Sequence, residues 1–450
     1  MKILLVSANT LKVPYPVYPI GLDHVAASLD ERHRVRIVDL NLPDADEKLI
    51  ETIGLFSPDL IGISLRNIDN TDSTDPRGYL HGYRSVVETI RRASDAPVVL
   101  GGSGFTLFPR KIMQALAADY GIVGEGERLN LLVDALETGR DPKGLPGIIL
   151  NETSPADFPP PWQGDRKPRL ERPPEHLAWY LDHGAMLNLQ TKRGCPFRCI
   201  YCTYPLIEGR KLRLVDPKEA ARTALTLEKA GARYLYITDS TFNADIQHSL
   251  AVARAFKEIG LGIPWGAFFT PLALPDGYFD ELAEAGLKHV EFGTDSLSNA
   301  VLKSYGKPFT VDHVVAAHNA ALAAGRHVAH YLLLGGPGET PQTLEETLAQ
   351  IDGLRLTVFF FFCGMRVYPQ TTLWQRSVAE GGLSAERDLI DPLFYQSPAI
   401  SAEVIERRVV EKAAGRSNWV IGAGGDDTAA IIRRMYAKGF SGPLWEYLIG

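Results

Sequence analysis

The sequence predicts an α/β protein in which a doubly wound parallel sheet is followed by an incomplete (β/α)6 TIM-like barrel and a small helical C-terminal region. Three observations predict this class. Apolar runs of strand length alternate with amphipathic helical stretches. Each run is continuously apolar, as in strands buried on both faces. A Pro-rich polar segment divides the alternation into two series.

The first series predicts a doubly wound, Rossmann-like domain over residues 1–150. Its strands are expected at 2–9, 35–40, 60–67, 96–103 and 119–127, with helices at 20–31, 82–93 and 110–118. Ligands bind such sheets at the carboxyl ends of the strands. Here those ends are Ser7–Thr10, Ser64–Asn67, Gly101–Thr106 and Gly124–Glu127. Their glycines permit close approach of a ligand, but ordinary turns also use glycine.

Residues 151–185 are expected to be a Pro-rich linker, and residues 186–375 a second β/α series. Strands are expected at 186–191, 234–239, 264–269, 289–293, 327–336 and 357–367, with helices at 217–230, 250–259, 276–285, 311–324 and 341–354. No topological break interrupts the series, which favours a partial barrel over a second doubly wound sheet. Residues 376–450 are predicted to be helical.

Charge and hydropathy exclude several function classes. The chain has 47 Lys and Arg residues and 54 Asp and Glu residues, which gives a net charge of −7. It contains no run of basic residues of the kind that binds nucleic acid. The longest apolar stretch, Val358–Met365, is far shorter than the ~20 residues of a membrane helix. The N-terminus is typical of a strand and not of a signal peptide. We therefore expect a cytoplasmic protein without a transmembrane segment.

Three of the four cysteines, Cys195, Cys199 and Cys202, follow the first predicted barrel strand, while Cys363 lies alone in a Phe-rich strand, as a buried hydrophobe would. Thiolates hold iron–sulfur clusters. The alternative, structural zinc, prefers four ligands. No fourth Cys or His follows within about ten residues, and the nearest before the strand is His183. Three ligands would leave one iron of a [4Fe–4S] cluster open.

The CxxxCxxC spacing, with Tyr201 before the last cysteine, resembles the radical S-adenosylmethionine (SAM) superfamily. The resemblance implies a [4Fe–4S] cluster on the three cysteines and SAM on its open iron. It also implies that SAM contacts Tyr201, Thr238, Asp239, Ser240, Glu291, Ser296, Gly335 and Gly338. The superfamily's glycine-and-glutamate pattern after the second strand is absent here. Simpler roles stay open for Glu291 in an ion pair, Ser296 as a helix cap, and Glu339 and Thr340 as a helix start.

The N-terminal series looks like the cobalamin-binding domain that precedes the barrel in B12-dependent radical SAM enzymes. The residues that this resemblance places at cobalamin are Asn9, Ser64, Leu65, Arg66, Gly101, Gly102, Ser103, Thr106, Gly124 and Glu127. The DxHxxG signature, which supplies a histidine to cobalt in the wider class, is missing. Leu65 or Arg66 is therefore expected at the lower face of cobalt, and the glycine-rich segments at the nucleotide tail.

The combined resemblance implies a methyltransferase. A 5′-deoxyadenosyl radical would remove a hydrogen from an unactivated carbon of a small-molecule or lipid-type substrate, and methylcobalamin would supply the methyl group. The cofactors carry this chemistry, with electrons from a flavodoxin- or ferredoxin-type donor. The alternative is a cyclase, ring-contracting or C–C bond-forming enzyme without net methyl transfer. A noncatalytic cobalamin-binding protein would leave the three cysteines without a use.

Overall fold

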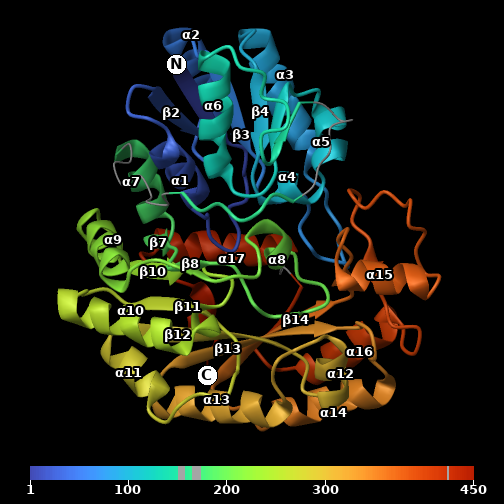
Figure 1. The fold of residues 1–450 in the computed structure, drawn as a ribbon. Helices are drawn as coiled ribbons and strands as arrows, with labels where there is room; N and C mark the ends of the chain where they lie inside the picture. Colours follow the sequence, from blue (N-terminus) through green and yellow to red (C-terminus); the bar gives the residue numbers. More distant parts are fainter. Residues whose placement is uncertain (151–157, 165–173, 423–424, 450) are drawn as a thin grey trace.

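Two parallel sheets lie one above the other in the computed structural model, which describes residues 1–150, 158–164, 174–422 and 425–449. The upper sheet belongs to the N-terminal domain and the lower sheet is the curved wall of the barrel (Figure 1). The predicted fold class is confirmed. Among the described residues, no helix combines the length and apolar character of a membrane span.

The N-terminal sheet has the strand order β2-β1-β3-β4-β5-β6. Its strands are β1 (Lys2–Ser7), β2 (Arg34–Asp39), β3 (Leu60–Ser64), β4 (Val98–Gly101), β5 (Tyr120–Ile122) and β6 (Ile148–Ile149). Only β6 runs antiparallel to its neighbour. The helices are α1 (Ile20–Ser28), α2 (Ala45–Phe56), α3 (Leu80–Ala93), α4 (Ser103–Leu107), α5 (Pro109–Leu116), η1 (Gly126–Arg128) and α6 (Leu129–Glu137). This doubly wound order places the topological switch point between β1 and β3.

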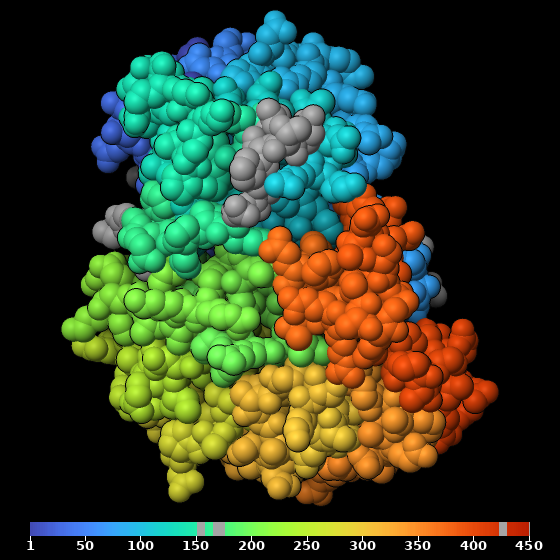
Figure 2. All heavy atoms as spheres, turned by 45° about the vertical axis from the view of Figure 1, so that its right-hand side comes forward, coloured from blue at the N-terminus to red at the C-terminus, as the bar shows by residue number. Residues whose placement is uncertain are grey.

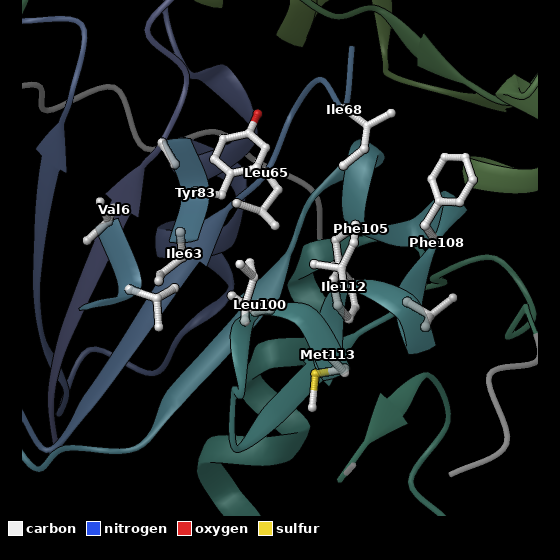
Figure 3. Close-up of a cluster of buried hydrophobic side chains, with 14 of the residues drawn as sticks. Val6, Ile63, Leu65, Ile68, Tyr83, Leu100, Phe105, Phe108, Ile112 and Met113 are labelled. Carbon is white, nitrogen blue, oxygen red and sulfur yellow. The ribbon is translucent and has the colours of Figure 1, made fainter. Parts of the chain in front are cut away.

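The core of this domain lies under the edge that faces the barrel. Figure 3 shows Ile63 and Leu100 from the sheet beside Phe105 and Ile112 from α4 and α5, all at most 2% exposed. Burial of such side chains stabilises by roughly 1.5–3 kcal/mol each. The loops at the carboxyl edge therefore rest on a closely packed support.

The six predicted barrel strands are all present, and a seventh joins them. They are β7 (Met186–Leu189), β10 (Tyr234–Ile237), β11 (Trp265–Phe269), β12 (Leu287–Asp295), β13 (His327–Leu334) and β14 (Thr357–Cys363), with β17 (Trp419–Ile421) beside β14. The outer helices are α9 (Pro217–Lys229), α10 (Ile246–Ile259), α11 (Tyr278–Glu284), α12 (Asn299–Ser304), α13 (Val311–Ala323) and α14 (Pro341–Ile351), and η2 (Phe242–Ala244) precedes α10. All neighbouring strands are parallel, and β7 and β17 form the two edges of the sheet.

The C-terminal region contains the expected helices and also contributes to the barrel. Its elements are the end of α15 (Thr372–Ala379), β16 (Phe394–Tyr395), α16 (Ala402–Ala413), β17, α17 (Gly425–Ala437) and η3 (Leu444–Leu448). The short strand β15 (Met365–Arg366), which precedes this region, pairs with β16. With three residues, β17 is too short for a periodicity that predicts a strand. Figure 2 shows the orange surface around α15 against both the barrel and the N-terminal domain. Leu373 of α15 belongs to the same buried cluster as Ile63.

The predicted linker lies partly outside the described residues. Within it, the structure shows a helix, α7 (Pro174–Asp182), where a Pro-rich linker is expected. Between the two sheets lie β8 (Lys192–Arg193), α8 (Tyr204–Ile207) and β9 (Arg213–Leu214), and β8 pairs with β9 (Figure 1). The segment that carries the three clustered cysteines is thus enclosed by both domains.

Candidate functional site

The three clustered cysteines lie in one loop between β8 and α8. Gly194 begins this loop with a φ of 88°, a conformation that favours glycine. The Cys195 N–H donates to the Gly209 carbonyl at 3.1 Å, and the Cys202 N–H donates to the Cys199 carbonyl at 3.2 Å. Backbone hydrogen bonds thus hold the loop at the carboxyl end of the first barrel strand, the end at which barrel enzymes place their reacting groups.

The donor set of this loop fits an iron–sulfur cluster. All three thiols are free, and Cys195 is buried. Burial is the main cause that raises the pKa of the Cys202 thiol to about 12, and nearby Cys199 and Cys195 raise it further. No three His, Cys, Asp or Glu side chains in the described part of the chain are grouped closely enough for a single metal ion. Three soft thiol donors in one loop are the ligands that iron–sulfur clusters use.

The residues after the second barrel strand brace the start of the cysteine loop. Buried Asp239 accepts hydrogen bonds from the Thr191 N–H at 2.8 Å, the Thr191 hydroxyl at 2.6 Å and the Lys192 N–H at 3.2 Å. The Ser240 hydroxyl donates to the Gly194 carbonyl at 3.3 Å, and the Thr238 hydroxyl donates to the β7 backbone. The structure thus places Ser240 against the first residue of the cysteine loop, and Asp239 and Thr238 against the segment that leads to it, with the Asp239 carboxylate already occupied by two backbone N–H groups and one hydroxyl.

A buried ion pair lies on the other side of the loop. The Tyr201 hydroxyl donates to Asp295 Oδ2 at 2.7 Å, and Lys307 Nζ lies 2.9 Å from the same oxygen. The side chains of Asp295 and Lys307 are each 6% exposed. Sequence reasoning missed both residues. Asp295 stands between the two selected residues Glu291 and Ser296, whereas Lys307 joins the site only through the tertiary fold.

The remaining predicted SAM contacts lie apart from one another. The Ser296 hydroxyl is fully buried and lies 3.1 Å from the Thr347 hydroxyl on α14. Gly335 and Gly338 have φ values of 83° and 89°, as expected for a glycine turn. After this turn, Thr340 caps α14 by accepting a hydrogen bond from the Thr343 N–H, as expected for the start of a helix.

Glu291 lies deep inside the barrel. Its Oε2 accepts hydrogen bonds from the hydroxyls of Tyr236 at 3.1 Å and Tyr331 at 2.9 Å. Its Oε1 accepts a hydrogen bond from the indole N–H of Trp445 on η3 at 3.1 Å and lies 3.2 Å from His289 Nε2. Sequence reasoning missed His289 and Trp445, whose proximity to Glu291 depends on how the chain closes the barrel.

The predicted cobalamin edge is built from closely spaced backbone. Gly102 has a φ of 99°, and a Cβ there would lie 2.6 Å from the Leu65 carbonyl oxygen. The buried Thr106 hydroxyl donates to the Gly102 carbonyl at 2.9 Å and accepts from the Gly124 N–H at 3.0 Å, and the Ser103 hydroxyl donates to the Arg66 carbonyl. Helix α4 packs against α8, so this edge adjoins the cysteine loop.

The two residues predicted to face cobalt have different environments. Leu65 is completely buried and points into the core drawn in Figure 3, whereas Arg66 is exposed at the edge. Ser64 and Gly101 end the paired strands β3 and β4 beside them. Asn9 is buried after β1, where its side chain accepts a hydrogen bond from the Leu11 N–H at 3.4 Å.

Glu127, the last predicted cobalamin contact, forms part of a buried ion-pair cluster that joins the domains. Arg193 Nη1 lies 2.7 Å from Glu127 Oε1 and 2.8 Å from Glu125 Oε1. Arg213 lies 2.7 Å from Glu125 Oε2. These charges clamp the β8–β9 hairpin, and hence the base of the cysteine loop, to the N-terminal domain.

Comparison with protein families agrees with this two-part architecture. The family profile for the B12 binding domain matches residues 6–132, and that for the radical SAM superfamily matches residues 189–351. The chain belongs to the B12-dependent radical SAM family.

Two relatives of this B12-dependent radical SAM protein align over most of its length. A protein of Pyrococcus horikoshii, named an uncharacterized methyltransferase, is 27% identical over 84% of this chain and 83% of its own. A tryptophan 2-C-methyltransferase of Streptomyces laurentii is 25% identical over 83% of this chain and 74% of its own.

Solved structures share the whole fold of this B12-dependent radical SAM protein. The radical SAM methyltransferase TsrM from Kitasatospora setae, solved with cobalamin and a [4Fe–4S] cluster bound, superposes with a TM-score of 0.85 at 23% identity, covering 100% of this chain and 97% of its own. The cobalamin-dependent radical enzyme OxsB gives a TM-score of 0.74 at 15% identity, covering 92% of this chain and 67% of its own.

Proposed function

We propose that this protein is a methyltransferase that binds a [4Fe–4S] cluster, SAM and cobalamin, and methylates an unactivated carbon of a small-molecule or lipid-type substrate after homolytic removal of a hydrogen. The observation that carries the proposal is the packing of α4 against α8. This contact sets the glycine-rich edge of one sheet beside the three-thiol loop of the other. Relatives named as methyltransferases over most of the chain support it.

The proposed cofactors supply reductive cleavage of SAM and carriage of a methyl group, while the protein binds and orients them. Cys195, Cys199 and Cys202 would hold the cluster. Buried Asp239 fixes the backbone before the first of these cysteines. The Asp295–Lys307 pair fixes Tyr201 beside the last.

The N-terminal edge would receive cobalamin without a protein histidine on cobalt. Its exposed Arg66, and not the buried Leu65, would lie toward the metal. Gly102 would hold the Leu65 and Arg66 segment closely against the end of β4, because a Cβ there would lie 2.6 Å from the Leu65 carbonyl oxygen. A flavodoxin- or ferredoxin-type electron donor and a cytoplasmic location belong to the same proposal.

Anaerobic reconstitution with iron, sulfide and hydroxocobalamin tests the cofactor assignment. We expect a brown protein with four irons per cluster and a bound corrin spectrum. Replacing Cys199 by Ala should remove the iron, whereas Cys363→Ala, which changes a buried cysteine of β14, should retain it. A colourless protein with zinc on the thiols and no affinity for the corrin would overturn the proposal.

Product analysis tests the reaction class. The reconstituted protein is incubated with SAM, a reductant and tryptophan, the compound in one relative's name. Methyl transfer gives S-adenosylhomocysteine together with 5′-deoxyadenosine. A relative from Rubrivivax gelatinosus, 26% identical over 56% of this chain, is named a cyclase, and such an alternative gives 5′-deoxyadenosine without S-adenosylhomocysteine.

A further inference from the structure

The segment that carries the three clustered cysteines has a charge opposite to that of the whole protein. Residues 192–214 contain six basic residues and one acidic residue, whereas the chain has a net charge of −7. The single acidic residue, Glu208, is turned toward the protein. Its Oε2 accepts a hydrogen bond from the Gly194 N–H at 3.0 Å, and its Oε1 accepts one from the Gln190 amide at 3.3 Å. Positive charge is therefore concentrated at the cysteine loop.

The six basic residues divide into two groups of three. Three are buried and have polar partners inside the protein: Lys192, Arg193 and Arg213. The other three are exposed: Arg198, Arg210 and Lys211. In the part of the chain that the structure describes, none of these exposed side chains forms an ion pair with a carboxylate. Their charges can therefore act on a molecule that approaches from solvent.

The end of α12 extends this positive surface. The Ile200 N–H donates to the Tyr305 carbonyl at 3.0 Å, and a Cβ on Gly306 would lie 2.6 Å from the Arg198 carbonyl oxygen. Lys303, in the last turn of α12, is exposed, and its carbonyl accepts a hydrogen bond from the Gly306 N–H at 3.1 Å. Lys303 is therefore a neighbour of Arg198 in space. We use the term cationic face for four exposed residues: Arg198, Arg210, Lys211 and Lys303.

The cationic face is the outer side of the loop whose thiols would hold the cluster. Arg198 directly precedes Cys199, which is itself partly exposed. The Arg210 guanidinium donates to the Phe197 carbonyl at 3.0 Å, which fastens it to the same loop. Leu214, which is 43% exposed, adds apolar surface close to the charges. A molecule that covers this face is therefore held against the cysteine loop.

Local stability does not account for these charges. Arg376 on α15 shows how a surface cation usually fastens two elements: its Nε lies 2.7 Å from Glu380 Oε1, and its Nη1 donates to the Ser304 hydroxyl at 3.1 Å. The cationic face instead gathers like charges without such a carboxylate in the described part of the chain. Like charges repel one another, so this arrangement costs stability until an acidic partner neutralises it.

The size and charge of the cationic face favour a small acidic protein as the partner. A surface that binds a nucleic acid duplex carries a stripe of cations for many phosphates, whereas this face offers four. Electron-transfer complexes are weak and bury less surface than most other protein complexes. Complementary charges raise their rate of encounter. Because the remainder of the chain has a net negative charge, an acidic carrier is repelled elsewhere and attracted here.

We propose that the cationic face is the docking site for a small acidic electron-carrier protein of flavodoxin type, which supplies the electron for cleavage of SAM. The proposal rests on the proposed function, which places a cluster on the three cysteines. In the transfer step one electron passes from the reduced carrier to the cluster, so the carrier is oxidised and the cluster reduced. No proton moves and no bond forms or breaks. The oxidised carrier then dissociates, since only a few exposed charges hold it.

Reduction of the reconstituted protein by reduced flavodoxin, without SAM, tests the docking. The EPR signal of the reduced cluster, followed after rapid mixing and freezing, gives the second-order rate constant. We expect Arg198→Glu/Lys211→Glu to lower this constant about tenfold or more at low ionic strength, and the difference to shrink to about twofold at about 0.5 M salt. Photoreduced deazariboflavin, a small neutral reductant, should reduce both proteins at the same rate. Equal constants with flavodoxin would overturn the proposal.

The matched control changes two exposed lysines on other elements, in the variant Lys143→Glu/Lys229→Glu. It has the same net charge and should keep the wild-type constant within about twofold. Equal slowing in both double variants would mean that net charge alone matters, and docking at the face would be wrong. The same holds if the face binds a poly(U) oligonucleotide while the flavodoxin constants stay equal. If Arg198→Glu/Lys211→Glu does not retain its iron, Lys303→Glu decides, with an expected slowing of about threefold.

Product analysis separates the docking from the proposed function. If flavodoxin reduces the wild type faster than Arg198→Glu/Lys211→Glu but no reductant yields S-adenosylhomocysteine, the methyl transfer fails and the docking stands. If deazariboflavin supports methyl transfer and flavodoxin reduces both proteins equally, the docking fails and the methyl transfer stands. For a protein that holds no cluster, calorimetric titration with flavodoxin compares the same two proteins, and equal affinities would contradict the docking.

Discussion

The two edges that meet at the candidate site are built in different ways. On the N-terminal sheet, backbone groups and small side chains pack against one another, as Gly102 packs against the Leu65 carbonyl. On the barrel, buried charges such as Asp239 and the Asp295–Lys307 pair hold the loops. Added atoms should therefore destabilise the first edge, whereas removal of a charge should destabilise the second. The backbone-lined N-terminal edge suits a wide, flat ligand, and the barrel edge, with its buried charges, suits a small, charged ligand.

Replacing Asp239 by Ala should give the largest effect, because two buried backbone N–H groups and one hydroxyl lose their charged acceptor. We expect the free energy of unfolding to fall by about 3–4 kcal/mol and iron per chain to fall with it. Urea unfolding and iron analysis measure these changes. The control is Asp216→Ala, which removes an exposed helix cap and should cost only about 1 kcal/mol. Equal losses in the two variants would contradict the role assigned to Asp239.

Gly102→Ala tests the opposite edge, where an added methyl group should be harmful. The new Cβ would lie 2.6 Å from the Leu65 carbonyl oxygen at a φ of 99°. We expect a loss of about 3 kcal/mol and weaker cobalamin binding in spectroscopic titration. At the adjacent Gly101, a Cβ would lie 3.8 Å from its nearest neighbour, so Gly101→Ala should cost less than about 1 kcal/mol. A loss at Gly102→Ala as small as that at Gly101→Ala would mean that the edge tolerates added atoms.

Glu125→Gln tests the cluster that joins the two edges. The change keeps the shape of the side chain but removes the charge that faces Arg193 and Arg213. Both arginines stay buried, so we expect a loss of about 2–3 kcal/mol. Cleavage by a protease near the β8–β9 hairpin should become faster, while the far-UV circular dichroism stays the same. An unaltered cleavage rate would show that the cluster does not clamp the hairpin.

The base of the barrel should show the smallest effect, which depends on pH. The pKa of His289 is about 9, raised from an ordinary value of 6.5 by Glu291 and Glu446 against burial. A raised pKa stabilises the fold fully below pH 6.5, and this stability is lost as the pH rises through 9. The rings of Tyr234, Tyr236 and Trp445 also pack around His289.

Between pH 7 and 9, the free energy of unfolding should therefore fall by about 2 kcal/mol. Denaturant titrations at several pH values measure this slope. In Glu446→Gln, one of the two carboxylates beside His289 is gone, so the curve should be flatter in this range. A slope that is the same in wild type and Glu446→Gln would contradict the charge state assigned to His289.

Local sequence signals predicted the parts of the site that a single segment builds. The cysteine loop follows a strand, the glycine turn near Gly335 has its positive φ, and the edge around Gly102 lies at the end of β4. In each case the residues that define the feature are neighbours in the chain, and so are the residues that set its backbone geometry. Periodicity and turn residues carry enough information for such features.

Contacts between distant segments could not be predicted in this way. Trp445 and Glu291 are 154 residues apart in the chain, and Lys307 reaches Asp295 only after α12 has packed. The side chains of Asp239 and Glu127 lie where the resemblance places cofactor contacts, and each also pairs with a protein group. A single sequence does not show which buried carboxylates already have partners within the protein.

The seventh strand and the floor of the barrel come from residues far along the chain, β17 and η3. During synthesis, six strands emerge from the ribosome before these residues do, and domains generally fold in the order of translation. Until β17 and η3 have been synthesised and packed, the β14 edge of the barrel is therefore unpaired and the position of η3 at its base is empty. Iron and corrin that bind before β17 and η3 have packed would meet a barrel in which β14 has an unpaired edge and Glu291 lacks Trp445, so the order of folding and cofactor loading becomes part of how this protein matures.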